Sequence, residues 1–180
     1  IKMNGQRYIH SFGNTNNLFV GYQAGNTTLT TATENTFVGS QAGQGLTTGS
    51  YNVAVGRGAG AGLTSGIMNT LIGRQTGSNI STGNSNTLIG LGAGELWTGS
   101  SAVMMGYYAG RWNSLGSSNV ILGSNANYYG NGNSQTISIG NNSLSSLVNG
   151  SNNVALGDWA DYYTPSNGSL ALAAGTNLGV

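Results

Sequence analysis

The sequence has few charged residues, no cysteine, and a single proline and histidine. Five of its 180 residues are Lys or Arg and four are Asp or Glu, so the net charge is +1. Without cysteine there is no disulfide framework and no thiolate metal site. A nearly neutral chain has no basic surface for nucleic acid or an anionic membrane, so we expect neither as a partner. No apolar run approaches the roughly 18 residues of a membrane-spanning helix, and we expect no membrane insertion.

Groups that could perform catalysis or bind a metal are equally scarce. His10 has no cysteine or carboxylate close to it in the sequence that could act as a second ligand. Asp158 and Asp161 are the only close pair of carboxylates, and they keep a polysaccharide depolymerase open as an alternative. The glycines do not form a phosphate-binding motif, because they recur with a regular period. We therefore expect a non-enzymatic protein with no catalytic residue, no metal site and no cofactor.

Glycine is abundant, with 32 residues, and many of these close a short repeated unit. The unit Asn-Thr-Leu-Ile-Gly occurs at residues 69–73 and again at 86–90. The closing glycines are Gly21, Gly39, Gly56, Gly73, Gly90, Gly106, Gly123, Gly140 and Gly157. Successive closing glycines are 16 to 18 residues apart, mostly 17, and a degraded tenth copy lies at 170–174. A fixed period of this length predicts a solenoid, in which each repeat is one coil.

The predicted fold is all-β: a parallel β-solenoid, or β-roll, of about ten 17-residue coils over residues 17–175. Residues 1–16 are interpreted as an N-terminal cap or lead-in, because the first coil exposes an edge that needs cover. Residues 176–180 are a tail. Each coil is expected to contain two short strands separated by two glycine corners.

Repeat columns give the expected role of each position. Four residues before the closing glycine, stacked amides predict a hydrogen-bonded ladder, made of Asn17, Asn35, Asn52, Asn69, Asn86, Asn119 and Asn153. Three residues after it, a column of mainly alanine from Ala24 to Ala160 predicts close packing. The next position predicts a corner with positive φ at Gly25, Gly43, Gly60, Gly77, Gly94 and Gly110. A second interior column consists of Leu29, Leu46, Leu63, Ile80, Trp97 and Leu147.

The residues around the closing glycine also predict an oligomer interface. The position just before the glycine is aliphatic in every repeat, from Val20 to Leu156, so we place it inside the coil. The position two residues before the glycine should then point outward, yet it is mostly apolar. The predicted interface residues are Phe19, Phe37, Leu71, Leu88, Met104 and Ile121. Nine coils at ~4.8 Å each would make an apolar stripe ~40 Å long, which identical copies could cover in a cyclic assembly.

Aromatic residues gather in the C-terminal half of the chain. Trp112, Tyr129 and Tyr163 lie six residues after a closing glycine, and Tyr128 and Tyr162 occupy the position before that. Stacked coils would place these side chains in columns, whose flat faces and hydroxyl groups suit contacts with sugar rings. These five residues are the candidate glycan contacts. The alternative is a structural role, either filling a wider oligomer interface or capping the far end of the solenoid.

The units NTFVGSQAG, NVAVGRGAG and NTLIGLGAG, linked through TTGS and STGNSN, resemble repeats of phage tail-fibre proteins and fibre-like bacterial surface proteins. They also resemble the head repeats of trimeric autotransporter adhesins. The resemblance covers about residues 5 to 175, although the adhesin-head coil is usually shorter than 17 residues. It implies a left-handed β-roll, a homotrimeric fibre, and attachment to a receptor from a virion or an extracellular position.

The expected function is therefore that of a structural and adhesive segment in a homotrimeric fibre. A phage tail fibre that binds a host-surface glycan or protein is the leading interpretation, with a virion location. A bacterial surface adhesin or a secreted extracellular filament is the first alternative. A monomeric solenoid that binds polysaccharide or ice is the second, and the apolar outward column disfavours it because such a surface should be flat and rich in threonine.

Overall fold

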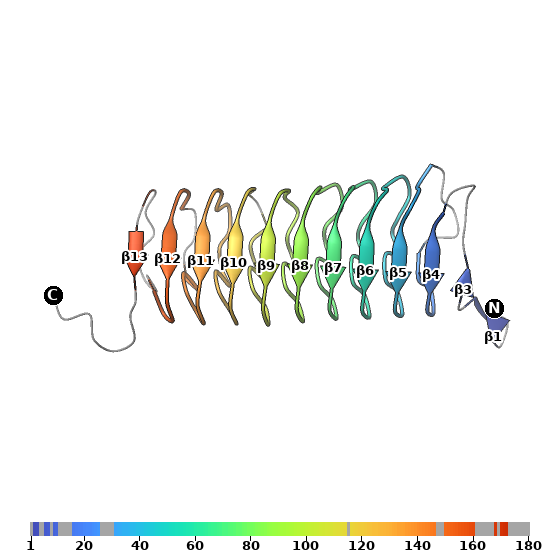
Figure 1. Ribbon diagram of the computed structural model, residues 1–180, viewed down its shortest axis with the longest axis horizontal. Coiled ribbons are helices and arrows are strands. Elements are labelled where there is room, and N and C mark those ends of the chain that lie inside the picture. Colours follow the sequence, from blue (N-terminus) through green and yellow to red (C-terminus); the bar gives the residue numbers. More distant parts are fainter. Residues whose placement is uncertain are drawn as a thin grey trace.

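The computed structural model describes residues 2–3, 6–7, 9–10, 16–25, 31–114, 116–146, 150–160, 168 and 170–172. All regular secondary structure in this part of the chain is β-strand. Coils are stacked along one long axis, and one strand of each coil joins a continuous sheet (Figure 1). The prediction of an all-β parallel β-solenoid is confirmed.

Ten strands of three residues each pair in parallel, in the order of the chain. They are β4 (Leu18–Val20), β5 (Thr36–Val38), β6 (Val53–Val55), β7 (Thr70–Ile72), β8 (Thr87–Ile89), β9 (Val103–Met105), β10 (Val120–Leu122), β11 (Ile137–Ile139), β12 (Val154–Leu156) and β13 (Leu170–Leu172). Equivalent positions of successive repeats are paired, as Leu71 with Leu88. This register turns the period of the sequence into columns of side chains.

The N-terminal strands do not follow the solenoid pattern. Strand β3 (Ile9–His10) pairs antiparallel with β4, whereas β1 (Lys2–Met3) and β2 (Gln6–Arg7) form a separate antiparallel pair. An open strand edge is a template for unwanted association, and β3 covers the edge of β4. The assignment of residues 1–16 as a cap or lead-in stays a prediction. The predicted tail at 176–180 lies outside the described residues.

Each described coil contains one strand, so the prediction of two strands per coil is wrong. Hydrogen bonds between coils continue outside the sheet, as between Gly62 N and Ser78 O at 2.7 Å. On the far side of the coil, however, the backbone N–H groups of Thr64, Ser65 and Gly66 all donate to the carbonyl of Ser81. Because three donors converge on one acceptor, this segment cannot form the regular ladder of a second strand.

The assignment of the two strand faces from the sequence is also wrong. The middle residue of each strand from β4 to β12 points into the coil and is buried, whereas the residues on either side face outward. The nine fully buried middle residues of β4 to β12 are Phe19, Phe37, Ala54, Leu71, Leu88, Met104, Ile121, Ser138 and Ala155. The predicted interface residues are therefore core residues. The buried asparagines explain this result. Each lies two positions before the middle residue, and residues two apart in a strand project from the same side, so the middle residue is inside with the Asn.

The asparagine ladder is present inside the coils. The amide nitrogen of Asn52 donates to Oδ1 of Asn35 at 2.9 Å, and Asn69 donates to Asn52 at 3.0 Å. At the position of Ala102 the ladder has no amide, and Nε1 of Trp97 donates to Oδ1 of Asn86 at 3.0 Å instead. The ladder therefore satisfies buried polar groups along the axis, and an indole replaces the missing amide.

The other predicted interior columns also hold where the structure describes them. Leu46, Leu63, Ile80 and Trp97 are fully buried, and Leu29 and Leu147 lie outside the described residues. The small residues Ala24, Ala42, Ala59, Thr76, Ala93, Ala109, Ala126, Ser143 and Ala160 are buried as well. The six predicted corner glycines have φ between 53° and 63°.

The closing glycines are required both by backbone conformation and by space. Gly73 has φ +134°, and a Cβ there would lie 2.4 Å from the carbonyl oxygen of Gly90 in the next coil. We expect Gly73→Ala to lower the free energy of unfolding by about 2–3 kcal/mol, measured by urea denaturation.

Gly58→Gln is the control for Gly73→Ala. Gly58 also has positive φ, but a Cβ at this position would have its nearest neighbouring atom 3.7 Å away, and Gln41 and Gln75 occupy the equivalent position in neighbouring coils. We expect a loss of only about 1 kcal/mol for this control, from the backbone conformation alone. An equal loss in both variants would contradict the argument from close approach.

Candidate functional site

The outward side of β4 to β13 is a flat aliphatic surface, here called the outer sheet face. It consists of the first and third residues of the ten strands. Its members with the largest exposed fractions, from 36% to 69%, are Leu18, Val38, Val53, Ile72, Val103, Met105, Ile137, Ile139, Leu156, Leu170 and Leu172. Its polar members are Thr36, Thr70 and Thr87. Ten strands at ~4.8 Å extend this surface over ~45 Å, which makes it a candidate interaction surface.

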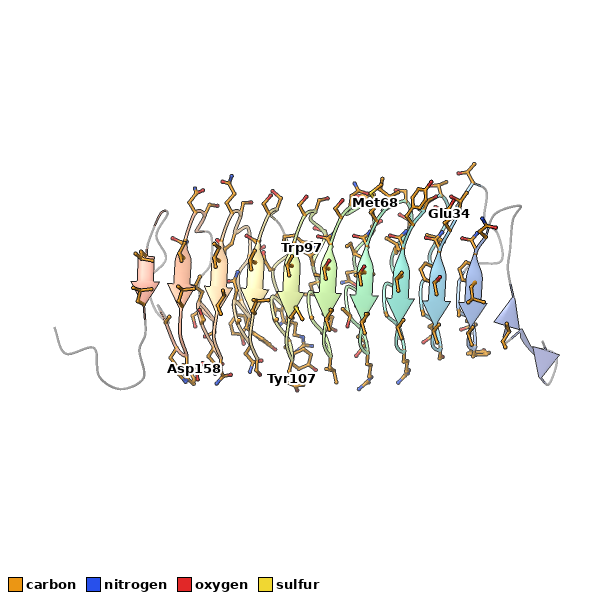
Figure 2. All side chains as sticks on the ribbon, viewed as in Figure 1. Glu34, Met68, Trp97, Tyr107 and Asp158 are labelled. Carbon is orange, nitrogen blue, oxygen red and sulfur yellow. The ribbon has the colours of Figure 1, made fainter. Side chains whose placement is uncertain are left out.

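The two long edges of the outer sheet face differ in chemistry. Glu34 and Met68 lie along one edge of the row of strands, and Tyr107 and Asp158 lie along the other (Figure 2). Arg57 and Arg74 occupy the same repeat position as Tyr107 and Asp158, directly after the closing glycine, and both are exposed. The charged side chains therefore lie at the borders of an uncharged face.

A cluster of aromatic side chains lies beyond the edge that carries Tyr107, and is here called the aromatic patch. It consists of Tyr107, Tyr108, Trp112, Tyr128, Tyr129 and Trp159. Ring centroids are 4.2 Å apart for Tyr107 and Tyr108, and 6.1 Å apart for Tyr108 and Tyr128. Tyr128 and Tyr129 meet edge to face at 4.7 Å. These separations lie within or slightly below the 4.5–7 Å usual for interacting rings.

The structure brings together part of the predicted glycan site. Trp112, Tyr128 and Tyr129 belong to the aromatic patch, whereas Tyr162 and Tyr163 lie outside the described residues. Sequence reasoning missed Tyr108 and Trp159 as members of the site. Both lie two residues after a closing glycine, so the repeat register would have placed them in one column.

An ion pair holds one side of the aromatic patch. Nε of Arg111 lies 2.6 Å from Oε2 of Glu95, and Nη1 of Arg111 donates to the hydroxyl of Tyr128 at 2.8 Å. The guanidinium carbon lies 4.3 Å from the centroid of the Tyr108 ring, as in a cation–π contact. Glu95, Arg111 and Tyr128 occupy the same position in three successive coils, five residues after the closing glycine. This shared column is the signal in the sequence that could have identified the ion pair.

Both titratable groups with shifted pKa values in this region keep their ordinary charge at neutral pH. Burial alone would lower the pKa of Arg111, but its hydrogen bonds to Glu95 and Tyr128 outweigh burial and raise it. Burial and the adjacent Tyr108 raise the pKa of the Tyr107 hydroxyl. Arg111 therefore stays a cation that Glu95 neutralises, and Tyr107 stays neutral.

A pocket of about 310 Å³ opens within the aromatic patch. It is lined by Tyr108, Asn125, Tyr128, Tyr129, Asn142, Ser145, Ser146 and Trp159. Tyr108 and Trp159 come from coils three steps apart, and Asn125 and Asn142 occupy the same column between them. The pocket thus has an aromatic residue at each end of an amide column.

The two aromatic residues of this column have strained backbones. Tyr108 has φ 53° and Trp159 has φ 60°, in the left-handed region that bulky residues avoid. This conformation costs roughly 1–2 kcal/mol for a residue with a Cβ. Gly58 and Gly92 occupy the equivalent position in other coils, with φ 68° and 62°. The same position has φ between 53° and 68° in every described coil from Gln23 to Trp159, so the left-handed conformation belongs to the repeat itself.

Within the described part of the chain, the remaining candidates for chemistry are not brought together into a site. Oδ1 of Asp158 accepts a hydrogen bond from the backbone N–H of Asn141 at 2.8 Å, and Asp161 lies outside the described residues. Among the described residues, no group of three or more His, Asp or Glu side chains could hold a metal ion. No helix long and apolar enough to cross a membrane occurs in the described part of the chain.

The architecture defines the class of the protein, which is a parallel β-solenoid with an exposed aliphatic sheet face and a lateral aromatic pocket. Comparison with family models, with curated proteins and with solved structures found no match to this chain.

Proposed function

We propose that this chain is a non-enzymatic structural and adhesive segment of a homotrimeric fibre, located in a phage tail fibre, that contacts a host cell surface. The observation that supports the proposal best is the outer sheet face. An aliphatic face that continues over ten coils needs a cover, because a monomer would leave it in water.

A second copy of the same chain is the occupant that fits this face. Each of the ten strands contributes two outward residues, which makes 20 positions, and a standard protein interface uses about 20–30 residues on each side. The face is apolar in its centre and carries charges such as Glu34 and Arg57 only at its edges, like the core and rim of an interface. Copies related by a cyclic axis parallel to the solenoid would bury identical faces against each other.

This arrangement would leave the flanks of each coil in contact with solvent. The aromatic patch lies on such a flank, so it would remain accessible for attachment while the aliphatic faces meet near the axis. The resemblance of the repeats to trimeric adhesin heads favours three copies. A bacterial surface adhesin or an extracellular filament would use the same geometry and remains the alternative proposal.

The native mass of the purified chain tests the assembly. We expect light scattering to give three times the chain mass of 18.3 kDa, and an unheated detergent gel to show the same species until the sample is boiled. Extensive burial of aliphatic side chains between copies would resist detergent in this way. A monomer would contradict the proposal and favour a single-chain binding solenoid.

A further inference from the structure

We propose that the pocket of the aromatic patch binds a neutral sugar, one or two pyranose rings of an uncharged surface glycan. The inference deepens the proposed function, on which it rests for the biological source of the glycan. The pocket is lined by eight side chains of one chain, so its binding can be measured separately from assembly.

The lining residues suit both the apolar C–H faces and the hydroxyl groups of a sugar. Rings of Tyr and Trp present flat apolar faces, against which the C–H faces of a pyranose can pack. Trp159 and Tyr129 are the most accessible of the lining aromatics, with 54% and 53% of their surface exposed. Asn125, Asn142 and Ser146 provide amide and hydroxyl groups that can donate and accept hydrogen bonds with sugar hydroxyls.

The dimensions limit the ligand. Tyr108 and Trp159 belong to coils three steps apart, which corresponds to roughly 14 Å along the axis. The volume of about 310 Å³ lies at the lower end of the range of about 300–1,000 Å³ for small-molecule pockets. We therefore infer a site for a monosaccharide or disaccharide unit, aligned along the solenoid, rather than for a long polysaccharide chain.

Charge selects against acidic saccharides. Among the described residues, none of those that line the pocket is charged. The nearby cation, Arg111, is bonded to Glu95 and Tyr128 and lies over the Tyr108 ring, so it is already engaged. A carboxylate or sulfate ester entering this pocket would lose its hydration without gaining a free cation. A neutral ligand has no such cost.

Binding can be tested with the whole chain on an array of neutral hexosides and N-acetylhexosaminides beside sialylated, uronic and sulfated glycans. We expect saturable binding of one or more neutral glycans and none of acidic glycans that lack such a unit. Titration of a bound saccharide should change the fluorescence of the exposed Trp159; a Trp112→Phe background removes the other exposed tryptophan of the aromatic patch, and the fully buried Trp97 then provides a constant signal. Binding restricted to acidic glycans, or no binding to any neutral glycan, would overturn the inference.

Substitutions distinguish glycan binding in the pocket from nonspecific binding to exposed aromatic residues. We expect Trp159→Ala and Tyr129→Ala each to weaken binding roughly tenfold or more, with an unchanged melting temperature. Tyr51→Ala is the matched control, because Tyr51 is 51% exposed but lies in a distant coil, and its affinity should equal that of the parent. Equal affinities in all three variants would place the glycan elsewhere and contradict the proposal.

The oligomeric state of the same samples distinguishes the two proposals. A trimer that binds no neutral glycan would leave the fibre proposal intact and refute the pocket. A monomer that binds a neutral glycan through Trp159 would support the pocket and refute the trimeric fibre.

Discussion

Replacement of Asn69 by alanine is expected to destabilise the solenoid by about 3–5 kcal/mol, although only a small polar side chain is removed. Nδ2 of Asn69 donates to Oδ1 of Asn52 at 3.0 Å and to the carbonyl of Gly83 at 2.9 Å. Its Oδ1 accepts from the backbone N–H and the side-chain amide of Asn86, at 3.1 and 3.0 Å. Alanine would leave several of these buried groups without a partner and without access to water.

The measurement is thermal unfolding followed by circular dichroism at one protein concentration. For a chain of this size the loss corresponds to a fall in melting temperature of about 10 °C. Asn79→Ala is the control, because the Asn79 side chain lies at the surface, and we expect no measurable change. If the two variants melt together, the ladder does not stabilise the coils.

A matched pair of substitutions in β7 is expected to give opposite results for stability and assembly. Leu71→Glu places a carboxylate at a fully buried position, which should cost more than about 4–5 kcal/mol and leave the chain largely unfolded. Ile72→Glu introduces the same group one residue later, at a side chain that is 38% exposed. The single chain should tolerate Ile72→Glu, and its free energy of unfolding should fall by no more than about 1 kcal/mol.

Ile72→Glu, which leaves the fold intact, should prevent assembly. If identical outer sheet faces meet in a trimer, Ile72→Glu places three carboxylates in an apolar interface, where each loses its hydration without a partner charge. We expect light scattering to show that this variant is a folded monomer with the circular dichroism spectrum of the parent. A trimeric Ile72→Glu protein would exclude the outer sheet face as the interface.

The repeat period was sufficient to predict the solenoid and most of its columns. Spacing alone identified the amide ladder through Asn52 and Asn69, the small column at Ala42 and the corner at Gly43. These features depend on stacking identical positions, and stacking follows from the period. The same reasoning found Trp112, Tyr128 and Tyr129 as neighbours, because residues at equal or adjacent repeat positions lie close in successive coils.

The interior and exterior of the strands could not be assigned in the same way. Leu71 and Ile72 are both aliphatic, so hydrophobicity does not distinguish the two faces of a strand that is apolar on both. The buried position of Asn69 decides the question, since it projects from the same side as Leu71. The prediction of a second strand in each coil was wrong for a related reason. The hydrogen bonds that converge on the Ser81 carbonyl replace a regular ladder, and they depend on the path of the backbone.

For this protein the sequence by itself determined what repeats: the coil length, the stacked asparagines, the glycine corners and the column in which each aromatic residue lies. These follow from local spacing, which a linear sequence contains. Only the tertiary structure decided which strand face is buried, and that Tyr108 and Trp159 close a pocket with Asn142 between coils. These depend on the direction in which each side chain leaves the backbone, which is determined by the closure of the whole coil around its core.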